Sequence, residues 1–182
     1  MKAIPVLVIA FALSLSGCET MPAAGAGGPA ITEAYRVHSG HVTPPARIAL
    51  GPLDLARADD PVTRAYVGAV AAELSRLGFT PVGDIAQADL LASVDVRTGG
   101  PGELAMTGPD MLRSQTMLTG PAPLTALTVQ IRRRHDGTPL WQGRATTQLA
   151  PARGDVATLS VPLARALFAD FPGESGRSIR SR

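Results

Sequence analysis

Apolar and polar side chains alternate over residues 88–97, and this alternation predicts a β-strand. Leu90, Ala92, Val94 and Val96 fall on one side of such a strand, and mostly polar residues fall on the other. A period of two residues is typical of an antiparallel sheet that has one face against a hydrophobic core. We therefore expect the apolar side of this strand to cover the core of the domain.

A β-hairpin is predicted where two further apolar runs, residues 124–134 and 139–149, flank an Asp-Gly pair. A two-residue loop would place Ile131 opposite Gln142, so that an apolar side chain would face a polar one. A three-residue loop, His135 to Gly137, places Ile131 opposite Trp141 and gathers the apolar residues on one face. It also gives Gly137 the left-handed conformation that such loops need. We therefore predict the three-residue loop.

Two helices are predicted from apolar residues that recur every three or four positions. The first covers residues 61–77, with Asp60 as its N-cap, Pro61 at its first position and Gly78 as its C-terminal cap. The second runs from about residue 158 to 170. Pro162 favours a start near Ser160, with that serine as the cap, because proline is tolerated only in the first turn.

Shorter strands are expected at residues 34–37, 47–50 and 79–82. Together with the longer ones they make about five or six short strands, several of them adjacent in sequence as hairpins. Two helices beside such strands predict an α+β fold, with both helices packed on one face of a mainly antiparallel sheet.

The start of the chain has the pattern of an export signal. Lys2 precedes an apolar run over residues 3–13, which is shorter than the 20 residues or so that a membrane-spanning helix needs. The run ends in Leu15, Ser16, Gly17 and Cys18, which resembles the lipobox of a bacterial lipoprotein. In that pathway the Cys18 thiol is joined to diacylglycerol, and the chain is cut after Gly17. The alternative is an ordinary secretory signal with an incidental cysteine.

The lipobox divides the chain into a cleaved leader (1–17), a lipidated cysteine with a flexible Gly/Ala/Pro-rich tether (18–30), one domain (31–173) and a disordered tail (174–182). Cys18 is the one cysteine, so no disulfide can form within the chain. Glu19 favours the outer membrane, with the domain facing the periplasm. Loss of Lys2 with the leader lowers the net charge from +2 to +1, which argues against nucleic acid as a partner.

Residues 98–122 interrupt the pattern with glycines and prolines, and they exceed the usual length of an unstructured loop. Methionine side chains adapt to partner surfaces. The segment is therefore a candidate contact with a partner protein, and its alternative is a mobile insertion. The contact candidates are Met106, Met111, Leu112 and Met117.

Residues suited to catalysis or metal binding are few. His38 and His41 lie three positions apart, but no second cluster of His, Cys or paired carboxylates completes a site. We therefore predict neither a metal nor a cofactor, and no enzyme activity.

The one charge run is Arg132, Arg133 and Arg134, in which the first and third arginines would share a strand face. It is a candidate contact with lipid headgroup or lipopolysaccharide phosphates, or else a hairpin end that blocks aggregation.

Three segments resemble a family of bacterial envelope lipoproteins that carry domain of unknown function 4136. They are residues 88–91 at the start of a strand, Asp136-Gly137 leading into residues 140–143, and Leu167 through Phe171-Pro172. The resemblance covers roughly residues 88–172, with a gap over the long loop. It implies a small α+β domain on a membrane tether, and it transfers no activity and no catalytic residues.

The expected function is that of a non-catalytic lipoprotein, held by membrane lipid through Cys18, that binds or scaffolds another envelope component. One alternative is an accessory factor for outer-membrane export or cell-wall assembly, acting through residues 98–122. Another is an envelope enzyme, which would need a pocket that gathers His38, His41 and carboxylates.

Overall fold

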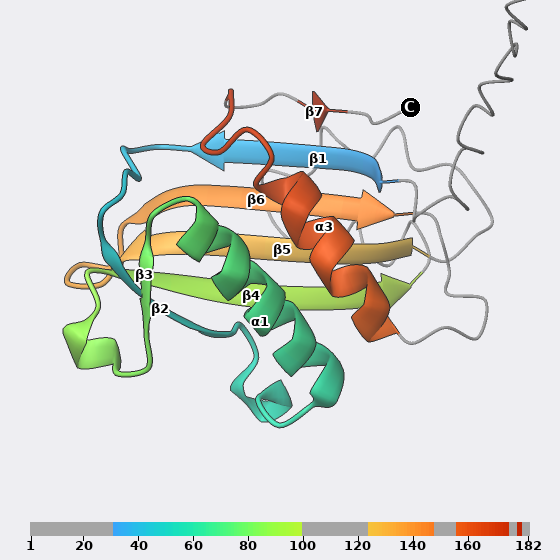
Figure 1. The fold of residues 1–182 in the computed structure, drawn as a ribbon, viewed down its shortest axis with the longest axis horizontal. Coiled ribbons are helices and arrows are strands. Elements are labelled where there is room, and N and C mark those ends of the chain that lie inside the picture. Colours follow the sequence, from blue (N-terminus) through green and yellow to red (C-terminus); the bar gives the residue numbers. More distant parts are fainter. Residues whose placement is uncertain (1–30, 100–123, 148–155, 175–177, 180–182) are drawn as a thin grey trace, which may run out of the picture.

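The structure, a computed structural model, describes residues 31–99, 124–147, 156–174 and 178–179. Figure 1 shows how its helices and strands are arranged. In chain order they are β1 (Ile31–His38), β2 (Arg47–Pro52), α1 (Pro61–Arg76), β3 (Thr80–Val82), β4 (Leu90–Gly99), β5 (Leu124–Arg133), β6 (Pro139–Thr147), α3 (Ser160–Leu167) and β7 (Ser178–Ile179). Short 3₁₀ turns, η1 (Leu55–Arg57), η2 (Ile85–Gln87) and η5 (Val156–Leu159), connect some of them.

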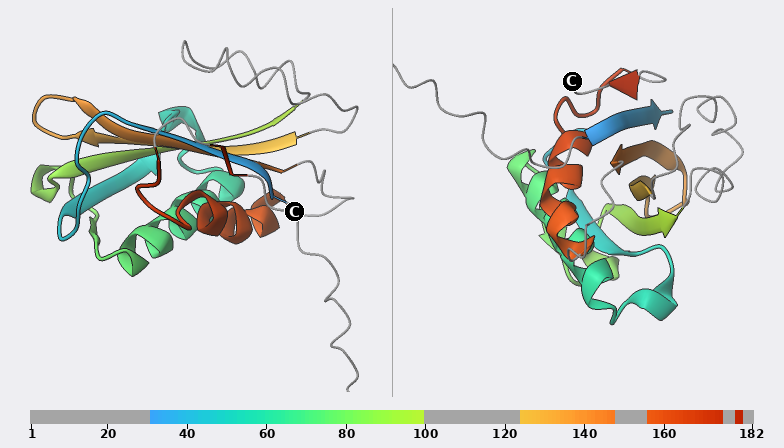
Figure 2. Two further views of the ribbon diagram at one scale, coloured as in Figure 1. Left: turned by 90° about the horizontal axis from the view of Figure 1, so that it is seen from above. Right: turned by 90° about the vertical axis from the view of Figure 1, so that its right-hand side faces the viewer.

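The described strands form one seven-stranded sheet in the order β3-β2-β4-β5-β6-β1-β7. Pairing is antiparallel except that β2 runs parallel to β3 and to β4. Both helices lie on one face of the sheet (Figure 2). The α+β fold predicted from the sequence is therefore confirmed. Strands β1 and β2 follow each other in the chain but do not pair, because β1 lies beyond β6.

The core lies between the sheet and the two helices. The apolar side of β4 faces it as predicted, and the helices contribute Tyr66, Val70 and Leu74 from α1 and Leu163 and Leu167 from α3, all fully buried. Packing of these side chains is the main source of stability for a domain of this size.

The β5–β6 hairpin has the predicted register, and Ile131 pairs with Trp141. The predicted loop length is wrong, because Arg133 pairs with Thr138 through a backbone hydrogen bond of 2.9 Å and leaves a four-residue loop, 134–137. The register shifts between Ile131 and Arg132, so that Leu140 is an extra residue on β6. This β-bulge lets Leu140 and Trp141 both be buried although they are consecutive. Gly137 has the expected positive φ of 70°.

Helix α1 has the predicted ends. The Asp60 carboxylate accepts hydrogen bonds from the backbone N–H groups of Val62 and Thr63, and Gly78 follows the helix with a φ of 93°. Helix α3 begins at Ser160, but Ser160 is not its cap. The helix continues directly from η5, and its N-cap residue Leu159 makes no side-chain capping hydrogen bond.

Arg36 of β1 joins the sheet to the end of α3. Its guanidinium is buried and donates hydrogen bonds from Nε to the Leu167 carbonyl (2.8 Å) and from Nη2 to the Ala166 carbonyl (3.0 Å). These carbonyls lie at the C-terminal end of α3, where no backbone N–H within the helix is available to them. A positive charge there also suits the helix dipole.

Two residues of the C-terminal segment, Ser178–Ile179, form β7 alongside β1, although the sequence predicts a disordered tail there. No helix among the described residues is long and apolar enough to cross a membrane.

Candidate functional site

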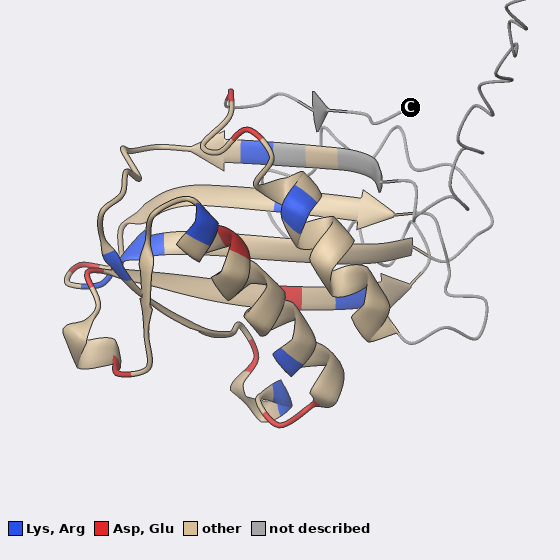
Figure 3. Ribbon diagram, viewed as in Figure 1, with Lys and Arg blue, Asp and Glu red and all other residues tan. Residues whose placement is uncertain are grey.

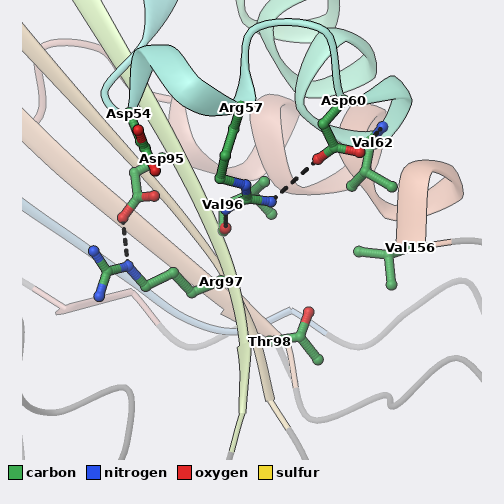
Figure 4. Close-up of a pocket in the computed structure, with 9 residues that line it drawn as sticks. All are labelled: Asp54, Arg57, Asp60, Val62, Asp95, Val96, Arg97, Thr98 and Val156. Atoms are coloured by element: carbon green, nitrogen blue, oxygen red, sulfur yellow. Dashed lines mark hydrogen bonds and ion pairs between the residues drawn. The ribbon is translucent and has the colours of Figure 1, made fainter.

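Two pockets lie at opposite ends of the sheet. The larger, of about 570 Å³, lies beside the end of β4 and the start of α1, and we call it the α1 pocket (Figure 4). Its lining residues are Asp54, Arg57, Asp60, Val62, Asp95, Val96, Arg97, Thr98 and Val156.

The charged groups of the α1 pocket already bond to one another or to the backbone. Arg57 donates to the Val96 carbonyl (2.8 Å) and to the Asp60 carboxylate (3.2 Å). Asp60 also accepts a 2.7 Å hydrogen bond from the Thr63 hydroxyl, which is the main reason that the pKa of Asp60 is lowered. These contacts fix the start of α1 against β4.

A second set of bonds involves the remaining carboxylates of this pocket. Asp95 pairs with Arg97 at 2.8 Å (Figure 4). Asp54 accepts a 3.0 Å hydrogen bond from the Ala56 N–H in η1. The described residues of this lining include no histidine, cysteine or lysine. The arrangement therefore organises the local fold, because its carboxylates are held by arginines, by Thr63 or by the backbone.

The smaller pocket, of about 340 Å³, lies at the hairpin end of the sheet, and we call it the hairpin pocket. Figure 3 shows basic positions gathered at this end of β5. The pocket is lined by His41, Asp89, Leu90, Arg133, Arg134, His135 and Leu140.

The three consecutive arginines do not divide between faces as the sequence predicts. Arg133 and Arg134 line the hairpin pocket together, whereas Arg132 bonds to Gln130 beside it on β5 and does not line the pocket. The difference arises because β5 ends at Arg133 and the four-residue loop begins at Arg134, so strand alternation does not extend to Arg134.

The hairpin pocket is held by bonds between the loop and the start of β4. The backbone N–H of Arg134 donates to the Asp89 carbonyl (3.0 Å), and the Arg134 Nε donates to the Ala88 carbonyl. The Asp89 carboxylate accepts a 3.0 Å hydrogen bond from the backbone N–H of Arg47, which is the main reason that its pKa is lowered. In the loop, hydrogen bonding to Thr138 lowers the pKa of Asp136 to about 2.

His38 is separated from the other two histidines. His38 Nε2 lies 3.1 Å from the Gly173 carbonyl, whereas His41 and His135 line the hairpin pocket. The segment before His41 is fixed to β6 by a 3.0 Å hydrogen bond from the Ser39 N–H to the Leu140 carbonyl. No group of three or more His, Cys, Asp or Glu residues in the described part of the chain is placed to hold a metal ion.

The sequence sets His41 beside His38 as a pair that nothing completes into a metal site, and nothing in it connects His41 with the arginines or with Asp89. No local pattern could have made that connection, because residues 41, 89 and 133 meet only through sheet pairing. The other sequence-predicted site residues lie outside the described residues. They are Leu15, Ser16, Gly17 and Cys18 in the leader and Met106, Met111, Leu112 and Met117 in the long loop.

Comparison with known proteins finds solved structures with a similar fold. No family model matches the sequence, and no curated protein matches it. Among solved structures, a PDZ domain protein from Parabacteroides distasonis aligns with a TM-score of 0.56 at 15% sequence identity. The alignment covers 82% of this chain, which spans only 39% of that protein's length.

A DUF4136 family protein from Bacteroides thetaiotaomicron aligns with a TM-score of 0.50 at 14% identity, and the alignment covers 76% of this chain and 95% of that one. The two proteins therefore correspond over most of their lengths in fold, but not in sequence. The resemblance to proteins with domain of unknown function 4136, found in three segments of the sequence, is confirmed for the fold: this chain folds as the DUF4136 family protein does.

Proposed function

We propose that the protein is a non-catalytic lipoprotein of the bacterial envelope, and that its domain binds or scaffolds another envelope component. The observation that carries the proposal is the sequence Leu15-Ser16-Gly17-Cys18, followed after a short tether by a domain with the fold of a DUF4136 family protein. Two or more acyl chains on Cys18 would hold the protein stably in a bilayer, at about 0.8 kcal/mol for each buried CH₂ group.

The anchor places the domain close to the membrane surface. The tether between Cys18 and Ile31 has about 12 residues rich in glycine, alanine and proline, and such a chain spans roughly 20 Å on average. We assign the anchor to the outer membrane, with the domain facing the periplasm, because Glu19 follows the cysteine where inner-membrane lipoproteins often carry aspartate.

A binding role agrees with the chemistry of the described residues. The carboxylates and guanidinium groups of the α1 pocket bond to each other or to the backbone, and they tie α1 to β4. A catalytic pocket needs a positioned base or nucleophile whose protonation is tuned to its task, and the residues that line this pocket provide none.

Lipidation can be tested by replacing Cys18 with serine. We expect wild-type protein to incorporate labelled palmitate and to sediment with the outer membrane, and the Cys18→Ser protein to lose both properties. Ser16→Ala is the matched control, because alanine is also small and should leave processing intact. A Cys18→Ser protein that still sediments with the membrane would contradict the proposal.

We further propose that the segment 98–122 contacts the partner, through Met106, Met111, Leu112 and Met117. Replacing these four residues with serine should reduce the recovery of crosslinked envelope proteins, while palmitate labelling stays unchanged. Equal recovery from the serine variant and the wild type would exclude these side chains as the contact.

A further inference from the structure

The hairpin pocket lies at the end of the sheet away from the tether. The N-terminal residue of β1, Ile31, pairs with Thr147 of β6, whereas His38 at the other end of β1 pairs with Trp141 near the hairpin. At about 3.3 Å per residue, β1 carries the chain roughly 23 Å from the tether toward the hairpin. A lipid anchor before residue 31 would therefore join the domain at the end opposite the hairpin pocket, and the pocket would be free to reach components on the side away from the anchoring membrane.

Several hydrogen-bond donors of this pocket make no bond to another described residue. Arg134 uses only Nε, toward the Ala88 carbonyl, and Arg133 uses only Nη1, toward Asp136 at 2.9 Å. His41 makes no hydrogen bond within the described residues. The remaining nitrogens of two guanidinium groups and one imidazole are thus available to a ligand.

The charge of the pocket favours an anion. Among its described lining residues, two arginines face one carboxylate, that of Asp89, and the backbone and side chain of Arg47 already contact this carboxylate at 3.0 and 3.5 Å. A second carboxylate, that of Asp136, lies outside the lining and pairs with Arg133 at 2.9 Å. Guanidinium groups bind carboxylates and phosphates through paired N–H donors. The α1 pocket differs, because both of its arginines pair with carboxylates of its own lining. In the hairpin pocket Arg133 pairs with Asp136, which is not among the lining residues, and Arg134 forms no ion pair with a described residue.

The volume and the apolar lining residues of the pocket favour one kind of anion. Its volume of about 340 Å³ is near the lower end for ligand sites, and Leu90 and Leu140 form part of its wall. A carboxylate with a small apolar group beside it fits these walls better than a hydrated phosphate does. The end of a peptide chain has this chemistry.

We propose that the hairpin pocket binds the terminal carboxylate of a peptide carried by an envelope component on the side away from the anchoring membrane. Arg133 and Arg134 hold the carboxylate, His41 supplies a further donor, and the two leucines contact the side chain next to it. The orientation rests on the proposed lipid anchor, whereas binding itself rests only on the described residues of the pocket.

The test uses full-length lipidated protein in nanodiscs of neutral phosphatidylcholine. The probe is a fluorescent Gly-Ala-Ala peptide with a free C-terminus, and its binding is followed by fluorescence anisotropy. We expect the C-terminal amide of the same peptide to bind at least tenfold more weakly, and Arg134→Gln to weaken binding at least tenfold. The matched control is Arg132→Gln, which removes a neighbouring arginine outside the pocket and should change binding less than twofold.

Three results would overturn the assignment: equal binding of the amide, equal losses in Arg132→Gln and Arg134→Gln, or displacement of the peptide by inorganic phosphate at equal concentration. If Arg134→Gln unfolds, Arg133→Gln replaces it, because that side chain bonds only to the exposed loop residue Asp136. Palmitate labelling of the same sample separates the two proposals. Lipidated protein that binds no peptide would reject the pocket alone, and peptide binding without lipid would reject the anchor and the orientation alone.

Discussion

Arg36 and Asp170 form an ion pair of 2.6 Å across the boundary between β1 and the segment that follows α3. The two partners differ in environment, because the Arg36 side chain is 2% exposed and that of Asp170 is 47% exposed. Burial lowers the pKa of Arg36, and the charge of Asp170 opposes this effect. Arg36 is therefore buried and bonded to α3, whereas Asp170 is open to solvent. We expect the hydrogen bonds of Arg36 to α3 to contribute more to the free energy of unfolding than its ion pair with Asp170.

Replacing Arg36 with leucine should lower the free energy of unfolding by about 3 kcal/mol, because two carbonyls at the end of α3 lose charge-assisted hydrogen bonds. Asp170→Asn should cost about 1 kcal/mol or less, as for a solvent-exposed ion pair. Urea unfolding of the two variants measures the difference. Equal losses would mean that the ion pair, and not the helix contact, carries the stability.

Gly143 on β6 leaves space for the aromatic side chain of Trp141. A Cβ atom at position 143 would lie 2.8 Å from Trp141 Cζ2 and from Leu167 Cδ1, which is closer than packed atoms tolerate. We expect Gly143→Ala to lower the free energy of unfolding by about 3 kcal/mol.

The matched control for this change is Gly51→Ala on β2, where nothing lies within 4 Å of the added atom. It should change stability by less than about 0.5 kcal/mol. Trp141 is the one tryptophan, so its fluorescence reports directly on the affected site. An unshifted Trp141 emission together with unchanged stability in Gly143→Ala would contradict this packing.

Acid should destabilise the domain below about pH 4. The pKa values of Asp60, Asp89 and Asp136 are lowered in the folded state, that of Asp136 to about 2, from an ordinary value of 3.8. Each carboxyl group therefore favours folding when it is ionised. This contribution is present above pH 3.8 and is lost as the pH falls toward 2.

Urea unfolding midpoints measured between pH 5 and pH 2 would test this dependence. Asp136→Asn keeps an oxygen that accepts the Thr138 hydrogen bond but cannot titrate, so its midpoint should fall less steeply with decreasing pH. Identical slopes for this variant and the wild type would contradict the assignment of Asp136.

The features that the sequence predicts well depend on nearby residues. Asp60, Pro61 and Gly78 define the ends of α1 through contacts within one turn, and the register of the hairpin follows from side-chain alternation across a short loop. The start of α3 was harder to predict, since Ser160 is buried and the chain enters the helix through a 3₁₀ turn. Because the 3₁₀ turn runs directly into the helix, Ser160 is the first helical residue and Leu159 holds the N-cap position.

Features that depend on distant pairing could not be predicted in this way. Nothing near Arg36 indicates that β1 lies between β6 and β7, or that its side chain reaches α3. The hairpin pocket also depends on distant pairing, because hydrogen bonds from Arg134 to the carbonyls of Ala88 and Asp89 hold the hairpin loop at the start of β4. The loop is one residue longer than predicted and begins at Arg134, so Arg134 lines the hairpin pocket with Arg133 and does not share a strand face with Arg132.

The position of β1 in the sheet also affects the order in which the chain can fold. Among the described strands, β1 pairs only with β6 and β7, so it has none of these partners until residues 139–147 are present. A chain that crosses a membrane with its N-terminus first would expose β1 to the periplasm before its partner arrives. Such late closure of a sheet slows folding and leaves an open strand edge. The open edge of β1 would then be exposed to pairing with other chains until β6 follows.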